Sequence, residues 1–148
     1  MYFREATTHD IPQIQIVRNA VKENTLSNPA LVTDADCENF ITQRGKGWVC
    51  EIANTIVGFA IADLQADNIW ALFVLPEQEH NGIGQRLQTI MLHWYFAQGK
   101  QKVWLGTAFN TRAEKFYKKT GWVAVGTNGA NEIKFEMTAK LWKQLNQN

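Results

Sequence analysis

Three β-rich runs lie close together in the middle of the chain, and they limit its possible folds more than any other feature. They cover residues 48–52, 56–64 and 68–74, and only three residues separate each run from the next. Links this short favour antiparallel neighbours, because a parallel crossover needs a dozen or more residues. The sequence therefore predicts an antiparallel meander at the centre of the fold.

Helices and further strands flank the meander on both sides. Capping residues, apolar periodicity and glycine or proline breaks predict helices over residues 7–24, 33–45, 83–98 and 111–121, and strands over 2–6, 102–107, 122–126 and 133–138. Residues 26–29 break the chain after the first helix, Gly45 and Gly47 end the second, and the tail 140–148 is expected to pack loosely or fray. Seven strands and four helices predict a mixed α/β fold of the α+β type. With no linker or repeat, we expect one domain over residues 1–148.

Charge and hydropathy exclude several classes of function. Fifteen Lys and Arg against fourteen Asp and Glu leave a net charge of +1, so no long-range field favours a nucleic acid or an anionic membrane. The longest apolar run, 69–75, is too short to span a bilayer, and the N-terminus lacks a signal-peptide pattern, which favours a cytoplasmic protein. Cys37 and Cys50 form no CxxC pair, so we expect buried thiols and no metal site.

A polar loop joins the third run to a helix with a strong apolar stripe. The run ends at Pro76, and Gly82-x-Gly84 begins the helix. Glycines allow a ligand to approach the backbone, and the unpaired first-turn N–H groups and the helix dipole favour an anion. The segment predicts a phosphate or pyrophosphate site, and a tight turn without a ligand is the alternative. A P-loop would need Lys and Ser or Thr after Gly84, and a dinucleotide fingerprint would need a third glycine where Leu87 stands.

Two segments, residues 74–87 and 110–122, carry a family resemblance. Val74-x-Pro76 through Gly82-Ile83-Gly84-x-x-Leu87 is similar to the acetyl-CoA loop of the GNAT family of N-acetyltransferases. Residues 110–122 resemble its later motif, N-x-x-A-x-x-F/L-Y-x-x-x-G-F/W, and the order of strands also fits. The resemblance covers essentially the whole chain. It implies the GNAT acyltransferase fold, with a mixed, mostly antiparallel seven-stranded sheet and about four helices, and acetyl-CoA as the cofactor.

The resemblance also implies a set of cofactor-binding residues. They are Leu72, Phe73, Val74, His80, Asn81, Gly82, Ile83, Gly84, Gln85, Asn110 and Tyr117. In this family the fourth strand splays from the fifth, and a backbone N–H, here of Phe73 or Val74, would polarise the thioester carbonyl. Glu79 departs from the family pattern, which has Gln or Arg at this position. Its carboxylate is unfavourable beside a pyrophosphate unless the side chain points away.

For catalysis, Tyr117 matches the family tyrosine that protonates the departing CoA sulfur, and packing beside Phe116 is the alternative. Asn110 would contact the cofactor or cap the following helix. Glu51 and Asp63, on strands next to the site, are candidates for a general base acting through water, with paired or solvated strand carboxylates as the alternative. The amine could also arrive already neutral.

The expected reaction is direct attack by an amine of a small molecule or peptide in a ternary complex. The acceptor site would form from the first two helices, where we expect Arg18, Lys22, Glu23 and Asn24 mainly on a solvated face. A homodimer is common among relatives, and we expect no nucleic-acid or membrane partner. A non-catalytic acyl-CoA-binding module is the alternative function, and Tyr117 favours the enzyme.

Overall fold

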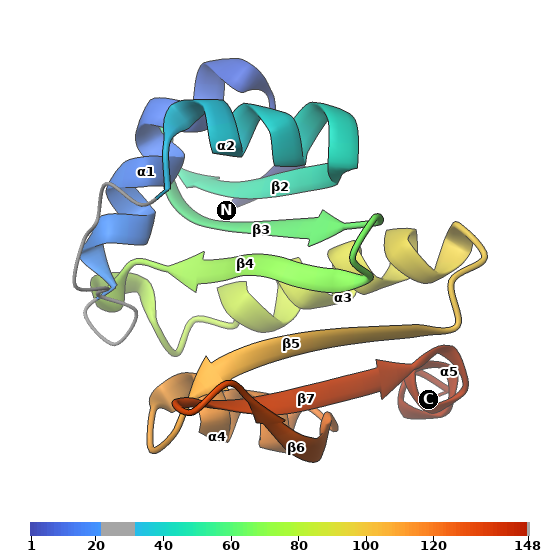
Figure 1. The fold of residues 1–148 in the computed structure, drawn as a ribbon. Helices are drawn as coiled ribbons and strands as arrows, with labels where there is room; N and C mark the ends of the chain where they lie inside the picture. The colour runs from blue at the N-terminus through green and yellow to red at the C-terminus, as the bar shows by residue number, and fades with distance from the viewer. Residues whose placement is uncertain (22–31, 148) are drawn as a thin grey trace.

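The computed structural model describes residues 1–21 and 32–147, and within them seven strands form one sheet. The order is β1-β2-β3-β4-β5-β7-β6, and every neighbouring pair is antiparallel except β4 and β5 (Figure 1). The strands are β1 (Tyr2–Glu5), β2 (Gly45–Ile52), β3 (Thr55–Asp63), β4 (Asn68–Val74), β5 (Lys102–Ala108), β6 (Val123–Asn128) and β7 (Glu132–Thr138). The predicted antiparallel meander is confirmed as β2-β3-β4.

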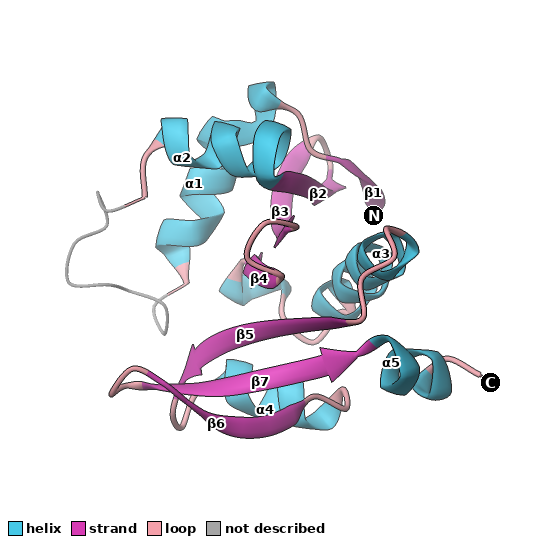
Figure 2. Ribbon diagram, turned by 45° about the vertical axis from the view of Figure 1, so that its right-hand side comes forward, coloured by secondary structure: helices cyan, strands magenta, loops and turns pink. Residues whose placement is uncertain are grey.

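Helices cover both faces of the sheet. They are α1 (Ile11–Ala20), α2 (Asp34–Asn39), α3 (Ile83–Ala97), α4 (Arg112–Lys119) and α5 (Ala139–Leu145), with short turns η1 (Thr8–Asp10), η4 (Phe40–Arg44) and η5 (Pro76–Gln78). Helices α1 and α2 lie on one face of β2–β4 and α3 lies on the other (Figure 2). Each face buries its own apolar cluster, the first around Ile14 and Phe59 and the second around Leu87 and Phe135. The mixed α/β fold is as predicted.

Strands β4 and β5 separate soon after they meet. Their only register pair is Asn68 with Trp104. A bulge also interrupts the β3–β4 ladder, since Ile61 faces Ala71 while Ala62 faces Ile69, which leaves Trp70 as the extra residue. Bulges bend a strand and end its regular pairing. The two strands therefore diverge toward their carboxyl ends, as Figure 1 shows, and within the described residues the β5-facing edge of β4 has no strand partner beyond Asn68.

Local helix signals were accurate at the start of α2. Thr33 Oγ1 accepts from the Asp36 N–H at 3.1 Å, and Asp36 Oδ2 accepts from the Thr33 N–H at 2.9 Å, so a capping box begins the helix predicted from residue 33. The described part of α1 ends at Ala20, and the predicted break at 26–29 lies outside the described residues.

The second helical stretch ends at Gly45 as predicted, since η4 ends at Arg44 and Gly45 is its C-cap. Both glycines also belong to β2, which begins before the predicted residue 48, and a β-carbon on Gly45 would collide with the Ala62 carbonyl of β3. The prediction for the tail is wrong. The tail is not loose: Thr138 Oγ1 accepts from the Leu141 N–H at 3.0 Å and starts α5, whose Trp142 is 8% exposed. One buried tryptophan holds this short helix against the sheet.

Candidate functional site

The loop between β4 and α3 turns sharply through two left-handed residues. The Leu75 N–H first donates to the Val57 carbonyl at 2.8 Å, which ties the loop to β3. His80 and Gly82 then adopt φ of 68° and 77°. Gly82 is the N-cap of α3 and supplies no side chain to its first turn, and nothing lies within 4 Å of where its β-carbon would be. The helix therefore begins at an open surface with uncapped N–H groups.

Gly84 brings three predicted segments together. A β-carbon added to it would lie 3.7 Å from the Val74 side chain at the end of β4 and 3.7 Å from the Phe116 ring of α4. The carboxyl end of β4, the amino end of α3 and helix α4 thus meet at the open end of the β4–β5 split. These are the segments to which the sequence assigned the cofactor.

Glu79 pairs with Arg112 at the first turn of α4. The Glu79 side chain is 24% exposed and that of Arg112 is 65% exposed. This ion pair links the loop to α4 and neutralises the carboxylate that the sequence placed beside an anion site. Glu79, which departs from the family pattern, is therefore paired with Arg112 of the segment 110–122.

Tyr117 lies in an apolar setting on α4. Its residue is 7% exposed, and its ring contacts Phe116, Trp122 and Phe135 at centroid distances of 5.3, 5.6 and 6.0 Å. Burial raises the pKa of its hydroxyl well above the ordinary value of 10.0, so the proton is retained. The ring packs beside Phe116, which was the alternative to a catalytic role. This packing also fixes the direction of the hydroxyl.

Asn110 adopts φ of 60°, a left-handed conformation that asparagine tolerates. It does not cap α4, because Thr111 is the N-cap and accepts from the Glu114 N–H at 3.2 Å. The Glu114 carboxylate accepts from the Asn110 N–H at 2.7 Å, one residue before the Thr111 N–H that a capping box would use. The Asn110 side chain is exposed beside the helix start.

Neither candidate base is unpaired. Asp63, 1% exposed, accepts from Arg44 at 2.7 and 3.2 Å and lies at the closed end of β4, opposite Asn68. Glu51 accepts from Arg4 Nη2 at 3.1 Å, and it lies on β2, two strands or roughly 10 Å from β4. Both carboxylates are held in ion pairs, which is the alternative that the sequence left open. The structure does not bring them to the site around Gly84.

Arg18 of α1 lies in a different environment from the one that the sequence predicts. It is half-buried rather than solvated, and its guanidinium lies over the Trp70 and Phe73 rings of β4 at 5.1 and 5.3 Å. Helical periodicity alone assigned it to a polar face, and only tertiary packing shows that this face meets β4. Lys22, Glu23 and Asn24 lie outside the described residues.

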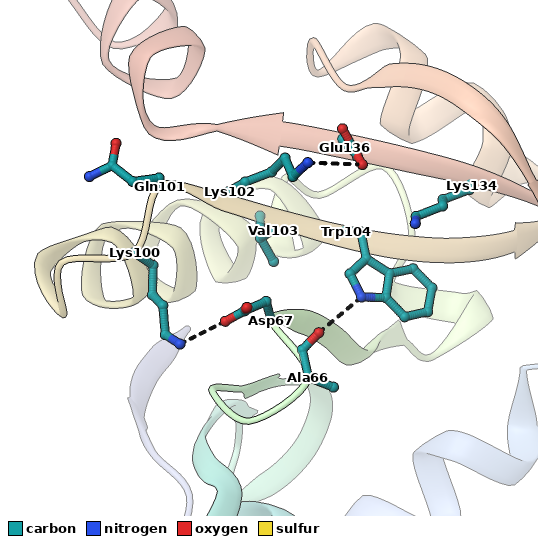
Figure 3. Close-up of a pocket in the computed structure, with 9 residues that line it drawn as sticks. All are labelled: Ala66, Asp67, Lys100, Gln101, Lys102, Val103, Trp104, Lys134 and Glu136. Atoms are coloured by element: carbon teal, nitrogen blue, oxygen red, sulfur yellow. Dashed lines mark hydrogen bonds and ion pairs between the residues drawn. The ribbon is translucent and has the colours of Figure 1, made fainter.

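A shallow hollow of about 340 Å³ lies at the opposite end of the sheet. Its lining comes from the β3–β4 turn and the first residues of β5, and it includes an ion pair of Lys100 with Asp67 at 2.7 Å and a hydrogen bond from the Trp104 indole to the Ala66 carbonyl at 3.0 Å (Figure 3). The Lys102 ammonium faces Glu136 at 3.5 Å. These contacts satisfy the charges locally, and the hollow is remote from the loop at Gly82.

Across residues 1–21 and 32–147, no cluster of three or more His, Cys, Asp or Glu could hold a metal ion, and both cysteines are buried and free. No helix in that part of the chain is long and apolar enough to cross a membrane.

Comparison with known proteins gave one family and many similar folds. A sequence profile of the acetyltransferase (GNAT) family matches residues 14–122. No curated protein matches the chain. A PaiA N-acetyltransferase from Thermoplasma acidophilum, solved with coenzyme A, has a TM-score of 0.81 at 17% identity over 93% of this chain and 98% of its own.

Two further solved structures show the same likeness. The ribosomal-protein-S18-alanine N-acetyltransferase from Escherichia coli has a TM-score of 0.71 at 16% identity, over 92% of this chain and 90% of its own. An aminoglycoside 6′-N-acetyltransferase complexed with coenzyme A has a TM-score of 0.74 at 17% identity, over 93% of this chain and 97% of its own. At these identities the structures show that the fold is shared.

Proposed function

The chain belongs to the GNAT acetyltransferase family, and on this basis we propose that it transfers an acetyl group from acetyl-CoA to a primary amine of a small molecule or peptide. The enzyme is an acetyl-CoA-dependent acetyltransferase, and the acceptor class and the direct attack in a ternary complex are parts of the proposal. A cytoplasmic location and a homodimer remain predictions.

The loop before α3 fits the pyrophosphate of this cofactor. The uncapped N–H groups of Ile83, Gly84 and Gln85 face outward at the positive end of α3, and the space around Gly82 is clear. His80 and Asn81, both exposed, lie at the rim of the same turn. Backbone donors would hold the phosphates here, while Glu79 is kept aside by Arg112.

The free edge of β4 fits an extended arm of the cofactor. Beyond Asn68 the strand has no partner toward β5 among the described residues. The Leu75 N–H donates to Val57 of β3, and Phe73 lies opposite Phe59, so the backbone groups of Phe73 also point to β3. The N–H and C=O groups of Leu72 and Val74 point toward β5 and remain available for pairing. An extended ligand can bind a sheet edge through such main-chain groups. Asn110, beside the start of α4, would contact the cofactor from the β5 side.

Two of the chemical needs of the reaction fall to groups of this chain, and the third falls to water. Acetyl-CoA supplies the acetyl group as a thioester, whose carbonyl carbon the amine attacks. Of the two predicted donors, the Phe73 N–H points to β3, so the backbone N–H of Val74 would donate to the thioester oxygen, where negative charge develops. The Tyr117 hydroxyl would give its proton to the departing sulfur, and burial ensures that this proton is present. Because Glu51 and Asp63 are held by arginines, we propose that the amine loses its proton to water before attack.

The single observation that carries this proposal is the contact of Gly84 with Val74 and Phe116, which joins the phosphate loop, the split strand and the tyrosine helix. The test is thiol release from acetyl-CoA with a panel of primary amines. We expect turnover with at least one amine. If no amine reacts while acetyl-CoA still raises the melting temperature, the chain is a binding module; if neither occurs, cofactor binding itself is refuted.

A further inference from the structure

Arg18 of α1 is a half-buried cation without a counter-ion in the described chain. Its Nη1 is buried and has no hydrogen-bond partner, and it is the one buried side-chain polar atom in that state across the described residues. The Trp70 and Phe73 rings lie beneath its guanidinium at 5.1 and 5.3 Å. Phe40 stacks on Trp70 at 4.0 Å and 7°, which holds this aromatic floor in place.

The other half-buried arginines are all paired. Arg4 donates to Asp10 at 2.8 Å and to Glu51 at 3.1 Å, and Arg44 donates to Asp63 at 2.7 Å. No carboxylate in the part of the chain that the structure describes pairs with Arg18.

No group close to Arg18 in the described chain forms an ion pair with it. Burial raises the pKa of the neighbouring Cys37 thiol, which stays neutral. The two carboxylates at the start of α2 have other partners: Asp36 accepts from the Thr33 N–H at 2.9 Å and Asp34 accepts from the Gln15 amide at 3.3 Å.

Such a cation is costly unless something outside the protein satisfies it. An unpaired buried charge loses hydration that stacking on aromatic rings replaces only in part. The planar guanidinium with a free N–H matches the geometry of a carboxylate, which accepts two parallel hydrogen bonds. The aromatic floor also excludes water and strengthens such a pair.

The position of Arg18 relates this cation to the reaction. Trp70 and Phe73 point from β4 toward α1 and α2, whereas Leu72 and Val74 point to the face covered by α3. Arg18 therefore lies across β4 from the cofactor loop, one phenylalanine side chain away from the backbone that we assign to the thioester. An amine that reaches this backbone from the α1–α2 face would pass the guanidinium.

We propose that Arg18 binds a carboxylate of the acceptor, so that the preferred substrate is an amine that also carries a carboxylate, as in an amino acid or an acidic peptide. This inference rests on the proposed acetyl transfer and specifies its acceptor. Charge-assisted hydrogen bonds of this kind correspond to a preference of about ten- to a hundredfold over the uncharged counterpart.

The test compares kcat/KM for matched pairs of amines with acetyl-CoA. One arm pairs free amino acids with their carboxamides, and a second arm pairs short peptides that carry aspartate with those that carry asparagine. We expect the carboxylate member to be preferred about tenfold or more, and we expect Arg18→Gln to bring the ratio near one. Arg18→Lys, which keeps the charge but not the planar fork, should retain an intermediate ratio. The exposed Lys143→Gln on α5 is the matched control and should keep the wild-type ratio.

A binding measurement makes the result independent of turnover. Calorimetry with coenzyme A present should show tighter binding of N-acetyl amino acids than of N-acetyl amino acid amides to the wild type, and equal binding to Arg18→Gln. Turnover of amines without a carboxylate preference, or a preference that survives in Arg18→Gln, overturns this inference and leaves the proposed function standing. Loss of turnover with every amine refutes the proposed function instead, and a carboxylate preference in binding would still support the role of Arg18.

Discussion

Two buried tyrosines use their hydroxyl groups in opposite ways. Tyr95 donates to the Lys102 carbonyl at 2.8 Å, with Asp67 Oδ1 a second acceptor at 3.2 Å, whereas no residue of the described chain hydrogen-bonds the Tyr117 hydroxyl. Tyr117→Phe should therefore lower kcat about a hundredfold, the contribution of a general acid, with little change in the free energy of unfolding. Tyr95→Phe should lower the free energy of unfolding by about 1–3 kcal/mol, because a buried carbonyl loses its donor, and should leave kcat near wild type. Steady-state kinetics and denaturant unfolding measure both.

The pH dependence of wild-type kcat adds a second check on the role of Tyr117. Because burial raises the pKa of Tyr117, wild-type kcat should show no alkaline decline centred near the ordinary tyrosine value of 10.0. A Tyr117→Phe enzyme with wild-type kcat would contradict the role as general acid.

Asp10 provides a stability prediction that depends on pH. It accepts from Arg4 at 2.8 Å and from the Thr7 N–H at 2.7 Å, and these bonds hold its pKa below the ordinary 3.8. A lowered pKa in the folded state adds stability above pH 3.8, and this stability is lost as pH falls through the folded-state pKa. Asp10→Asn should cost about 2 kcal/mol at pH 7. Urea unfolding should show this difference shrink in strong acid, and a difference independent of pH would contradict it.

Single residues were the least predictable level from sequence. The pattern located Gly82, Gly84 and Tyr117 because a family motif fixes their spacing. The pattern did not show that Glu79 pairs with Arg112, or that Arg18 has no carboxylate partner among the residues the structure describes, since those facts depend on which elements pack together. Residues that act through tertiary contacts leave no local signal.

At the level of elements, two similar glycines lie at opposite ends of α3, and we expect their substitution to have different effects. Gly82 and Gly99 both have positive φ, 77° and 87°, and both have clear space around the missing β-carbon. Alanine at either position should cost about 1 kcal/mol of backbone strain. Only Gly82→Ala should also weaken acetyl-CoA binding, by about tenfold, because its methyl group projects beside the N–H groups that we assign to the phosphates. Calorimetry separates the two, and equal affinities would argue against the phosphate site.

Element boundaries followed from the sequence where local chemistry decides them. The Thr33–Asp36 box is self-contained, so its helix start was predictable. Gly45 reads locally as a helix stop, but its missing side chain is required by the close approach of β3, which comes later in the chain. Helix α5 was missed because seven residues are too few to show a clear period, and its stability depends on where Trp142 packs.

At the scale of the whole molecule, the sheet consists of β1–β4 and β5–β7, joined by one register pair and covered by α3. A ligand extended along β4 and held at the start of α3 would connect the two parts. Acetyl-CoA at a hundred times its Kd should add about 2.7 kcal/mol and raise the melting temperature by roughly 5–10 °C. Adenosine 3′,5′-bisphosphate, at the same concentration, has phosphates but no arm to pair with β4, and should give a clearly smaller shift. Equal shifts for the two ligands would show that the free edge of β4 contributes nothing to binding.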